Sequence, residues 1–569
     1  MEESSQLEIL LVKSGLTNKY QFIITFLFTV LFSFCEFFRV SVPFIEAFPF
    51  ILYNGNSIKL NYTLCDEIGV SKIKFDSNKS ISSLVMDFEI YCDKSKVTLI
   101  AIFLYSGMLL GGLFSFLFAD RYGRKHTLLT MIPSYIAFSL AFYFLKLNYW
   151  ISMVLLFLIG SNSYIIMITL LVYICEIVND KHIPIYITII VSGLPLGGIL
   201  NNVLFDYFNH SDWRWVVLIH ISLVFVFYVL LFLYIVESPI YYFNNGDFKR
   251  FKENLNKISR KNHGVYLQNE DFEFLTNTKM SLPSMDSTRL NIENDSLLPP
   301  DKDTTNIIPE EPLLVKNPEP DNLCINSNKF EDFASYFKFK MKDYTPLDLL
   351  RYKSQITNFL ILSYLWSLSE IILHGLNIQS QNLYDNNSFN YYIYFISFIV
   401  DLIGYFITLA LVMNKHFGYH KTLVLLQLFS FTILVLSLLF NDKINSIQHV
   451  MCLYILKLFS SCMYMQLTVI TIEIYPAMIR TKGLGFNKSF GKIGGIIGSL
   501  LAQHFKVEDS IIYYLAFLFF GLVFSHQLPL RIKTLSQFQI PENEVLMDGF
   551  PNKGKEKNTD KKETLEYLK

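Results

Sequence analysis

Long apolar stretches separated by short polar segments run along most of the chain. Each has roughly the 20 residues that an α-helix needs to cross about 30 Å of hydrocarbon. Six precede residue 237 and six follow residue 354, at about 20–41, 97–118, 126–146, 150–177, 184–206, 214–236, 355–375, 389–413, 422–440, 449–472, 484–504 and 510–528. The pattern predicts an all-α membrane protein whose twelve transmembrane helices form two six-helix bundles.

The polar segments between these stretches predict the domain organisation. We expect a cytosolic N-terminus at 1–19, a first bundle at 20–236 with an extracellular loop at 42–96, a cytosolic segment at 237–354, a second bundle at 355–528 and a cytosolic tail at 529–569. Within the cytosolic segment, the polar, Pro-rich composition of about 280–326 predicts a disordered linker. Amphipathic helices are expected on either side of it, at 246–262 and 330–342.

Composition agrees with a membrane protein and excludes other classes. The chain is 52% hydrophobic and 17% charged, and its mean hydropathy is +0.35, whereas soluble domains carry roughly 25% charged residues. A net charge of −1 and the lack of a basic stripe argue against nucleic-acid binding. The sequence holds no Walker motif, metal-ligand spacing or nucleophile motif, so we expect neither an enzyme nor a cofactor or metal site.

The short loops predict the orientation of the chain. With a cytosolic N-terminus, the inside loops carry Arg121, Arg124, Lys125, Lys181, Lys415, Lys421, Arg480 and Lys482, against only Lys146, Lys443 and Lys506 in the short outside loops. This asymmetry obeys the positive-inside rule. Four glycosylation sequons, at Asn61, Asn78, Asn209 and Asn386, then lie outside. Cys65 and Cys92 lie in the extracellular loop, where oxidising conditions permit a disulfide.

Several loop motifs carry a family resemblance. DRYGRK at 120–125 follows the second span, and a degenerate counterpart, NKHFGYHK at 414–421, follows the eighth. The other motifs are SLVMDFEIYCDK at 83–94, DWRW at 212–215, ESP at 237–239, EIYPAMIRTKG at 473–483 and KIGGIIG at 492–498. Together they make the chain resemble the major facilitator superfamily, and within it the organic cation, anion and zwitterion transporters.

The resemblance implies a mechanism and a set of gating residues. Two bundles would rock about a midplane site and expose it to one side at a time. The implied cytosolic gate comprises Asp120, Arg121, Gly123, Arg124, Lys125, Glu176, Glu237, Glu473 and Arg480. The chain departs from the family at Phe116, where the motif has Gly, in DKHIP at 180–184, which lacks an Arg, and in PLR at 529–531, which replaces an acidic PET sequence.

Two lysines in the eleventh span are candidate substrate-binding residues. Lys488 and Lys492 are four residues apart and share one helix face. In the family that the chain resembles, the residue before IGGI tends to be acidic in cation carriers and basic in anion carriers. A buried ammonium attracts an anion and repels a cation, so Lys492 favours an organic anion or zwitterion as substrate. The alternative is that Asp401 neutralises Lys492.

The seventh span adds three candidate site residues. Trp366, Glu370 and His374 repeat every four residues and form one stripe. Trp366 would stack on a planar substrate, and Glu370 with His374 would relay a proton. The alternative is that Glu370 pairs with a lysine such as Lys457. In the first span, Glu36 and Arg39 are three residues apart and predict a local ion pair.

These patterns lead to a functional hypothesis. We expect a monomeric transporter of small organic ions that works by alternating access in the lipid bilayer, with a proton or counter-ion as a coupling partner. The alternatives are an organic-cation or sugar carrier of the same fold, or a non-transporting receptor or assembly subunit. The plasma membrane is the expected location, and an acidic residue before a Leu pair, at Glu293, Leu297 and Leu298, leaves an endosomal membrane as the alternative.

Overall fold

The computed structural model describes residues 15, 18–208, 211–263, 267 and 353–528, apart from short gaps at 54–55, 61–63, 66–74, 77–81, 145–147, 383–390, 415–417, 440–445, 476–479 and 506. The four predicted glycosylation sites, at Asn61, Asn78, Asn209 and Asn386, lie outside the described residues. The predicted linker, the helix at 330–342 and the C-terminal tail also lie outside them.

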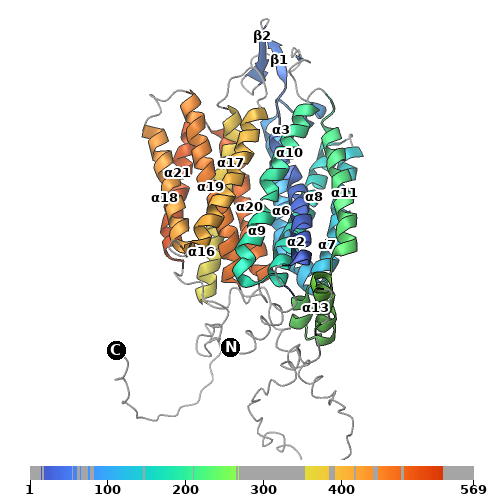
Figure 1. Ribbon diagram of the computed structural model, residues 1–569. Coiled ribbons are helices and arrows are strands. Elements are labelled where there is room, and N and C mark those ends of the chain that lie inside the picture. Colours follow the sequence, from blue (N-terminus) through green and yellow to red (C-terminus); the bar gives the residue numbers. More distant parts are fainter. Residues whose placement is uncertain are drawn as a thin grey trace, which may run out of the picture.

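The first bundle, blue to green in Figure 1, is built from the spans predicted before residue 237. Its helices are α2 (Lys19–Cys35) with α3 (Phe37–Ile45), α6 (Lys94–Tyr122), α7 (Arg124–Phe144), α8 (Tyr149–Ile177), α9 (Ile183–Val191) with α10 (Gly193–Tyr207), and α11 (Arg214–Tyr234). In two of the predicted spans, one helical segment follows the next after a one-residue turn, at Glu36 and at Ser192.

The second bundle, yellow to red in Figure 1, stands beside the first. It contains α16 (Lys353–Asn382), α17 (Tyr391–Met413), α18 (Gly418–Leu439), α19 (Ser446–Ile474), α20 (Arg480–His504) and α21 (Val507–His526). Among the described residues, eleven helical segments are long and apolar enough to cross a membrane. Helix α20 is the twelfth long helix and falls outside that set because Lys482, Lys488 and Lys492 lower its hydropathy.

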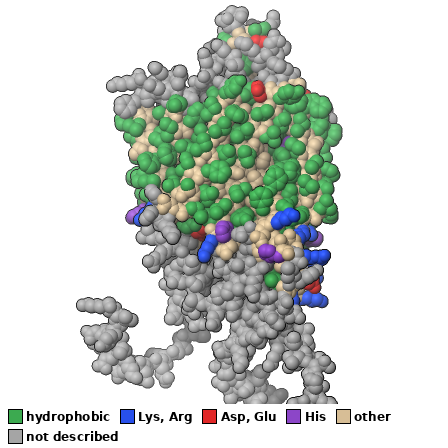
Figure 2. All heavy atoms as spheres, viewed as in Figure 1, with side chains coloured by type: hydrophobic (Ala, Val, Ile, Leu, Met, Phe, Trp, Pro, Cys, Tyr) green, Lys and Arg blue, Asp and Glu red, His purple; other side chains and the backbone are tan. Residues whose placement is uncertain are grey.

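The outer surface of the bundles suits a lipid environment. Figure 2 shows a hydrophobic band across the face in view, with the charged side chains gathered mainly below it, near α13 (Phe248–His263). Large apolar side chains such as Phe225, Leu233 and Phe519 are exposed on this surface. In water such exposure would be costly, but lipid tails solvate these groups. The predicted multi-pass membrane fold is confirmed.

Small residues let the central helices approach closely. Helix α6 packs against α8 in the first bundle, and α16 packs against α20 in the second. A side chain in place of Gly111 would meet the backbone of Ser161 on α8, and one in place of Gly494 would meet the backbone of Ser367 on α16. The Gly-rich segments of the sequence therefore act as contact faces between helices. The two bundles meet where α6 contacts α20 and where α10 contacts α17.

The loop between α3 and α6 is anchored to the first bundle. It contains the antiparallel strands β1 (Phe50–Tyr53) and β2 (Asn56–Lys59) and the short helix α5 (Leu84–Asp87). The disulfide predicted between Cys65 and Cys92 is present. At the end of α5, Asp87 accepts a hydrogen bond of 2.7 Å from the Trp213 indole and lies 2.8 Å from the Arg214 guanidinium. The DWRW motif thus holds the loop over this end of the bundle.

The opposite end carries α13, which matches the predicted amphipathic helix at 246–262. Its apolar side chains Phe248, Phe251 and Leu255 are buried. Lys261 donates a 2.5 Å hydrogen bond to the carbonyl of Tyr234 at the end of α11. Burial, together with the charge of Lys125, lowers the pKa of the Lys261 ammonium. Following the predicted orientation, we call this end of the molecule the inner end.

Candidate substrate site between the two bundles

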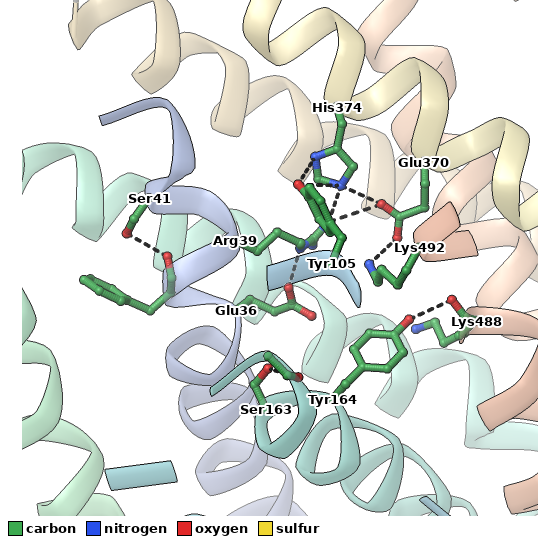
Figure 3. A network of polar contacts seen from close by, with 12 residues as sticks. Glu36, Arg39, Ser41, Tyr105, Ser163, Tyr164, Glu370, His374, Lys488 and Lys492 are labelled. Atoms are coloured by element: carbon green, nitrogen blue, oxygen red, sulfur yellow. Dashed lines mark hydrogen bonds and ion pairs between the residues drawn. The ribbon is translucent and has the colours of Figure 1, made fainter. Parts of the chain in front are cut away.

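A buried carboxylate, Glu370 on α16, joins charged groups from both bundles (Figure 3). Its Oε1 lies 2.5 Å from Nζ of Lys492 on α20, and its Oε2 lies 2.6 Å from Nε2 of His374 one turn further along α16. Oε2 is also 3.5 Å from Nη1 of Arg39, which comes from α3 in the first bundle. Such groups are costly in a membrane interior unless they are paired. Glu370 is thus a junction for three basic side chains.

Arg39 and His374 complete the link between the bundles. Arg39 forms an ion pair with Glu36, as the sequence predicts, but its Nη1 also lies 3.2 Å from Nε2 of His374. On the other ring nitrogen, Nδ1 of His374 is 2.8 Å from the hydroxyl of Tyr105 on α6. Sequence reasoning missed this contact between the bundles, although a charged pair within an apolar span is itself a signal of function.

A second buried ion pair lies within the second bundle. Nζ of Lys457 on α19 is 3.3 Å from Oδ2 of Asp401 on α17, and Ser461 donates a hydrogen bond to the same carboxylate. The structure therefore corrects both alternative pairings: Lys492 does not pair with Asp401, and Glu370 does not pair with Lys457. Lys492 lies on α20, which packs mainly against α16 and α6, whereas Asp401 lies on α17, which packs mainly against α19 and α10. Helix α16 also adjoins α19, but Lys457 reaches Asn377, two turns along α16 from Glu370.

Lys488 is also buried, but its surroundings are aromatic. Its Nζ lies 4.8 Å from the centre of the Trp366 ring and 5.4 Å from that of Tyr464. Among the described residues, this Nζ has no hydrogen-bond partner. Trp366 is held in place because its indole donates a 2.9 Å hydrogen bond to Thr471. Lys488 therefore lies over the Trp366 ring, and stacking of that ring on a substrate stays a prediction.

The space beside this network is small. A cavity of about 40 Å³ is lined by residues of both bundles, among them Arg39, Tyr105, His374, Asp401 and Tyr405. A water needs on the order of 10–15 Å³ on such a measure, so the cavity holds a few waters and no organic solute. In this arrangement the site has no room for an organic solute, and the bundles must move apart to admit one.

The inner end of the first bundle holds the charge cluster that the DRYGRK motif predicts. Arg124 at the start of α7 is buried, and its Nη2 lies 2.8 Å from Glu176 on α8 and 3.1 Å from Asp120 on α6. Glu237 accepts hydrogen bonds of 2.9 and 3.1 Å from the backbone amides of Arg124 and Lys125. A carboxylate at a helix N-terminus is stabilised by the unpaired amides and the helix dipole there.

The other predicted gate residues have different surroundings. Gly123 has a φ of +95°, and a side chain there would meet the carboxylate of Glu237. Arg121 is exposed, and its carbonyl accepts a 3.0 Å hydrogen bond from Tyr241. In the second bundle, Tyr419 donates a hydrogen bond to Glu473, and Nε of Arg480 donates one of 3.1 Å to the carbonyl of Ile472. The two bundles thus differ at their inner ends.

Two helical bundles that close over a buried ionic site define the class of this protein as a membrane transport protein of the two-bundle type. The family model described as Major Facilitator Superfamily matches residues 80–499. The chain therefore belongs to the Major Facilitator Superfamily, and the resemblance drawn from the loop motifs is confirmed.

Relatives and solved structures agree with this assignment. The chain is 22% identical to human organic cation/carnitine transporter 2 over 425 residues, which are 74% of this chain and 64% of that protein. It is 22% identical to the organic cation transporter protein of Drosophila melanogaster over 437 residues, 76% of this chain and 68% of that one. Thus the match spans 64% of the human relative's length.

The similar structures support the fold alone. The proton:xylose symporter XylE bound to 6-bromo-6-deoxy-D-glucose superimposes with a TM-score of 0.57 at 14% identity, covering 90% of this chain and 96% of that one. A human organic anion transporter superimposes with a TM-score of 0.53 at 10% identity, covering 89% of this chain and 99% of that one.

Proposed function

We propose that this protein transports a small organic anion across the membrane by alternating access. The position of the ionic site supports the proposal, because α3 and α6 of the first bundle and α16 of the second meet at His374. Rocking of the bundles would break these contacts and open the site to one side at a time. The small size of the cavity is consistent with a closed stage of such a cycle.

The charged groups of the site are the reason for proposing an anionic substrate. In the described part of the chain, Arg39, Lys457 and Lys492 pair with the carboxylates Glu36, Asp401 and Glu370, whereas the nearby Lys488 has no acidic partner. An excess positive charge in a low-dielectric site attracts an anion and repels a cation. The charge therefore favours an anion, although two relatives are named as organic cation transporters.

A coupling proton is the second part of the proposal. Glu370, His374 and Tyr105 form a continuous chain of contacts across the bundle interface, with distances of 2.6 and 2.8 Å between their polar atoms. Histidine is the side chain that titrates most readily near neutral pH. A proton on His374 would compete with Arg39 for Glu370, so protonation would be linked to separation of the bundles.

The disulfide of the extracellular loop supports a proposal for the location of the protein. The Cys65–Cys92 disulfide lies in the loop at the end opposite to α13. Disulfides persist where the surroundings are oxidising. This favours a membrane whose outer side faces such a space, and we propose the plasma membrane.

Uptake into proteoliposomes tests the proposed transport. The probes are labelled naphthalene monosulfonate as an anion, tetraethylammonium as a cation and glucose as a neutral sugar, each with and without a pH gradient. We expect saturable uptake of the sulfonate, at least about tenfold above protein-free liposomes, and exclusion of the cation. An inward proton gradient should raise the initial rate.

The other results of this experiment have definite meanings. Uptake of tetraethylammonium or glucose without the sulfonate would identify a cation or sugar carrier and contradict the anion proposal. Lack of uptake of all three probes by protein that melts cooperatively would favour a receptor or assembly subunit. An unchanged sulfonate rate across pH gradients would contradict proton coupling and leave anion transport standing.

A further inference from the structure

The buried basic side chains of the site differ in whether their charge is already satisfied. Lys492 pairs with Glu370 at 2.5 Å, Lys457 pairs with Asp401 at 3.3 Å, and Arg39 pairs with Glu36. Lys488 is 0% exposed, and among the described residues its Nζ has neither a salt bridge nor a hydrogen bond. In the described part of the site, Lys488 is therefore the lysine that lacks an acidic partner.

The surroundings of Lys488 fix the position of this charge. The Trp366 ring is held by Thr471 and meets the Tyr464 ring edge-on, with centres 5.2 Å apart and an interplanar angle of 87°. Tyr405 stacks on Tyr464, with ring centres 6.2 Å apart. The ammonium lies over both inner rings, where the ring quadrupoles attract it. These contacts supply charge compensation but use none of the three N–H donors of the ammonium.

Lys488 also lies where the two bundles meet. Its own carbonyl accepts a 3.0 Å hydrogen bond from Tyr164 on α8 of the first bundle (Figure 3). The next residue, Ser489, lies against Gly112 of α6, so closely that a side chain at position 112 would displace it. Separation of the bundles would therefore uncover this segment of α20 toward the path of a substrate, with the ammonium still held by Trp366 and Tyr464 of the second bundle.

We propose that Lys488 binds the charged group of the substrate, that the substrate is a monoanion, and that Lys492 serves as the fixed counter-ion of Glu370. The proposal rests on anion transport as the function. One carboxylate or sulfonate would neutralise the one excess charge and accept hydrogen bonds from the free N–H groups. A dianion would leave a net negative charge in a buried site, which is unfavourable.

Uptake by charge-matched probes and variants tests this assignment. Wild-type protein in proteoliposomes is compared for naphthalene monosulfonate and naphthalene disulfonate. We expect at least about tenfold faster uptake of the monosulfonate. Lys488→Met should lower that uptake at least about tenfold, and Lys488→Arg should retain most of it because the charge is kept. Lys257→Met, an exposed lysine on α13, is the matched control and should leave uptake unchanged.

A melting curve of each variant separates binding from folding. Lys488→Met breaks no hydrogen bond or salt bridge of the side chain among the described residues, so its melting temperature should equal or exceed that of the wild type. Full monosulfonate uptake by Lys488→Met, or faster wild-type uptake of the disulfonate, would overturn this inference while anion transport stands. Wild-type protein that moves the cation and neither sulfonate would overturn both proposals.

Discussion

Lys492→Met should destabilise the protein more than almost any other single substitution in the second bundle. The ammonium and the Glu370 carboxylate are 2.5 Å apart, and both side chains are 0% exposed. Without this ammonium, Glu370 keeps only His374 and the more distant Arg39 as partners. Removal of one partner of a buried ion pair costs about 3–5 kcal/mol in the free energy of unfolding. Thermal melting of the purified protein in detergent is the measurement, and we expect a clearly lower melting temperature.

Two further variants show whether the lost pair is the cause. Glu370→Gln combined with Lys492→Met removes both charges, so most of the lost stability should return. Lys488→Met makes the same chemical change one turn away on α20, where the side chain has no hydrogen bond or salt bridge to lose among the described residues. If Lys492→Met had the same melting temperature as the double variant or as Lys488→Met, the ion pair would contribute little to stability.

Arg124→Gln is expected to have the second large effect, at the inner end. The Arg124 guanidinium lies 2.8 Å from Glu176 and 3.1 Å from Asp120, and Glu237 binds the backbone amide of the same residue. Without it, three carboxylates would remain near one another with their main cation gone. We expect a loss of about 3–5 kcal/mol, measured as a fall in melting temperature.

The matched control for Arg124 lies in the same motif. Arg121 is exposed and its side chain reaches over the ring of Tyr122. Substitutions at such surface positions usually change stability by less than about 0.5 kcal/mol, so Arg121→Gln should melt close to the wild type. Equal effects of the two variants would mean that the net charge of the loop matters and the buried cluster does not.

The sequence predicted the helices well because most of them are long apolar runs. In lipid, the backbone of each segment must form its hydrogen bonds within that segment, so a long apolar run folds as a helix. The predicted spans at 97–118 and 150–177 correspond to α6 and α8, and each boundary differs by at most four residues. The sequence also predicted the amphipathic helix α13 and the disulfide in the extracellular loop, and both are present.

The sequence did not predict the turns within two of the spans. The predicted spans at 20–41 and 184–206 each contain a one-residue turn, at Glu36 and at Ser192. Hydropathy averages over a window and does not register a change at one position. Gly193 and Gly197 follow Ser192 and both pack against α2, but glycines at these positions do not predict where the turn lies.

By itself, the sequence determined a membrane fold of two bundles with a charge cluster at the inner end. It also showed that Lys488, Lys492, Glu370 and His374 lie within apolar spans. The tertiary structure alone decided which opposite charges on different helices are partners, because such an ion pair forms only where neighbouring helices bring the two residues within a few ångströms. It paired Lys492 with Glu370 and Lys457 with Asp401, brought Arg39 across the bundle interface, and left Lys488 among aromatic rings.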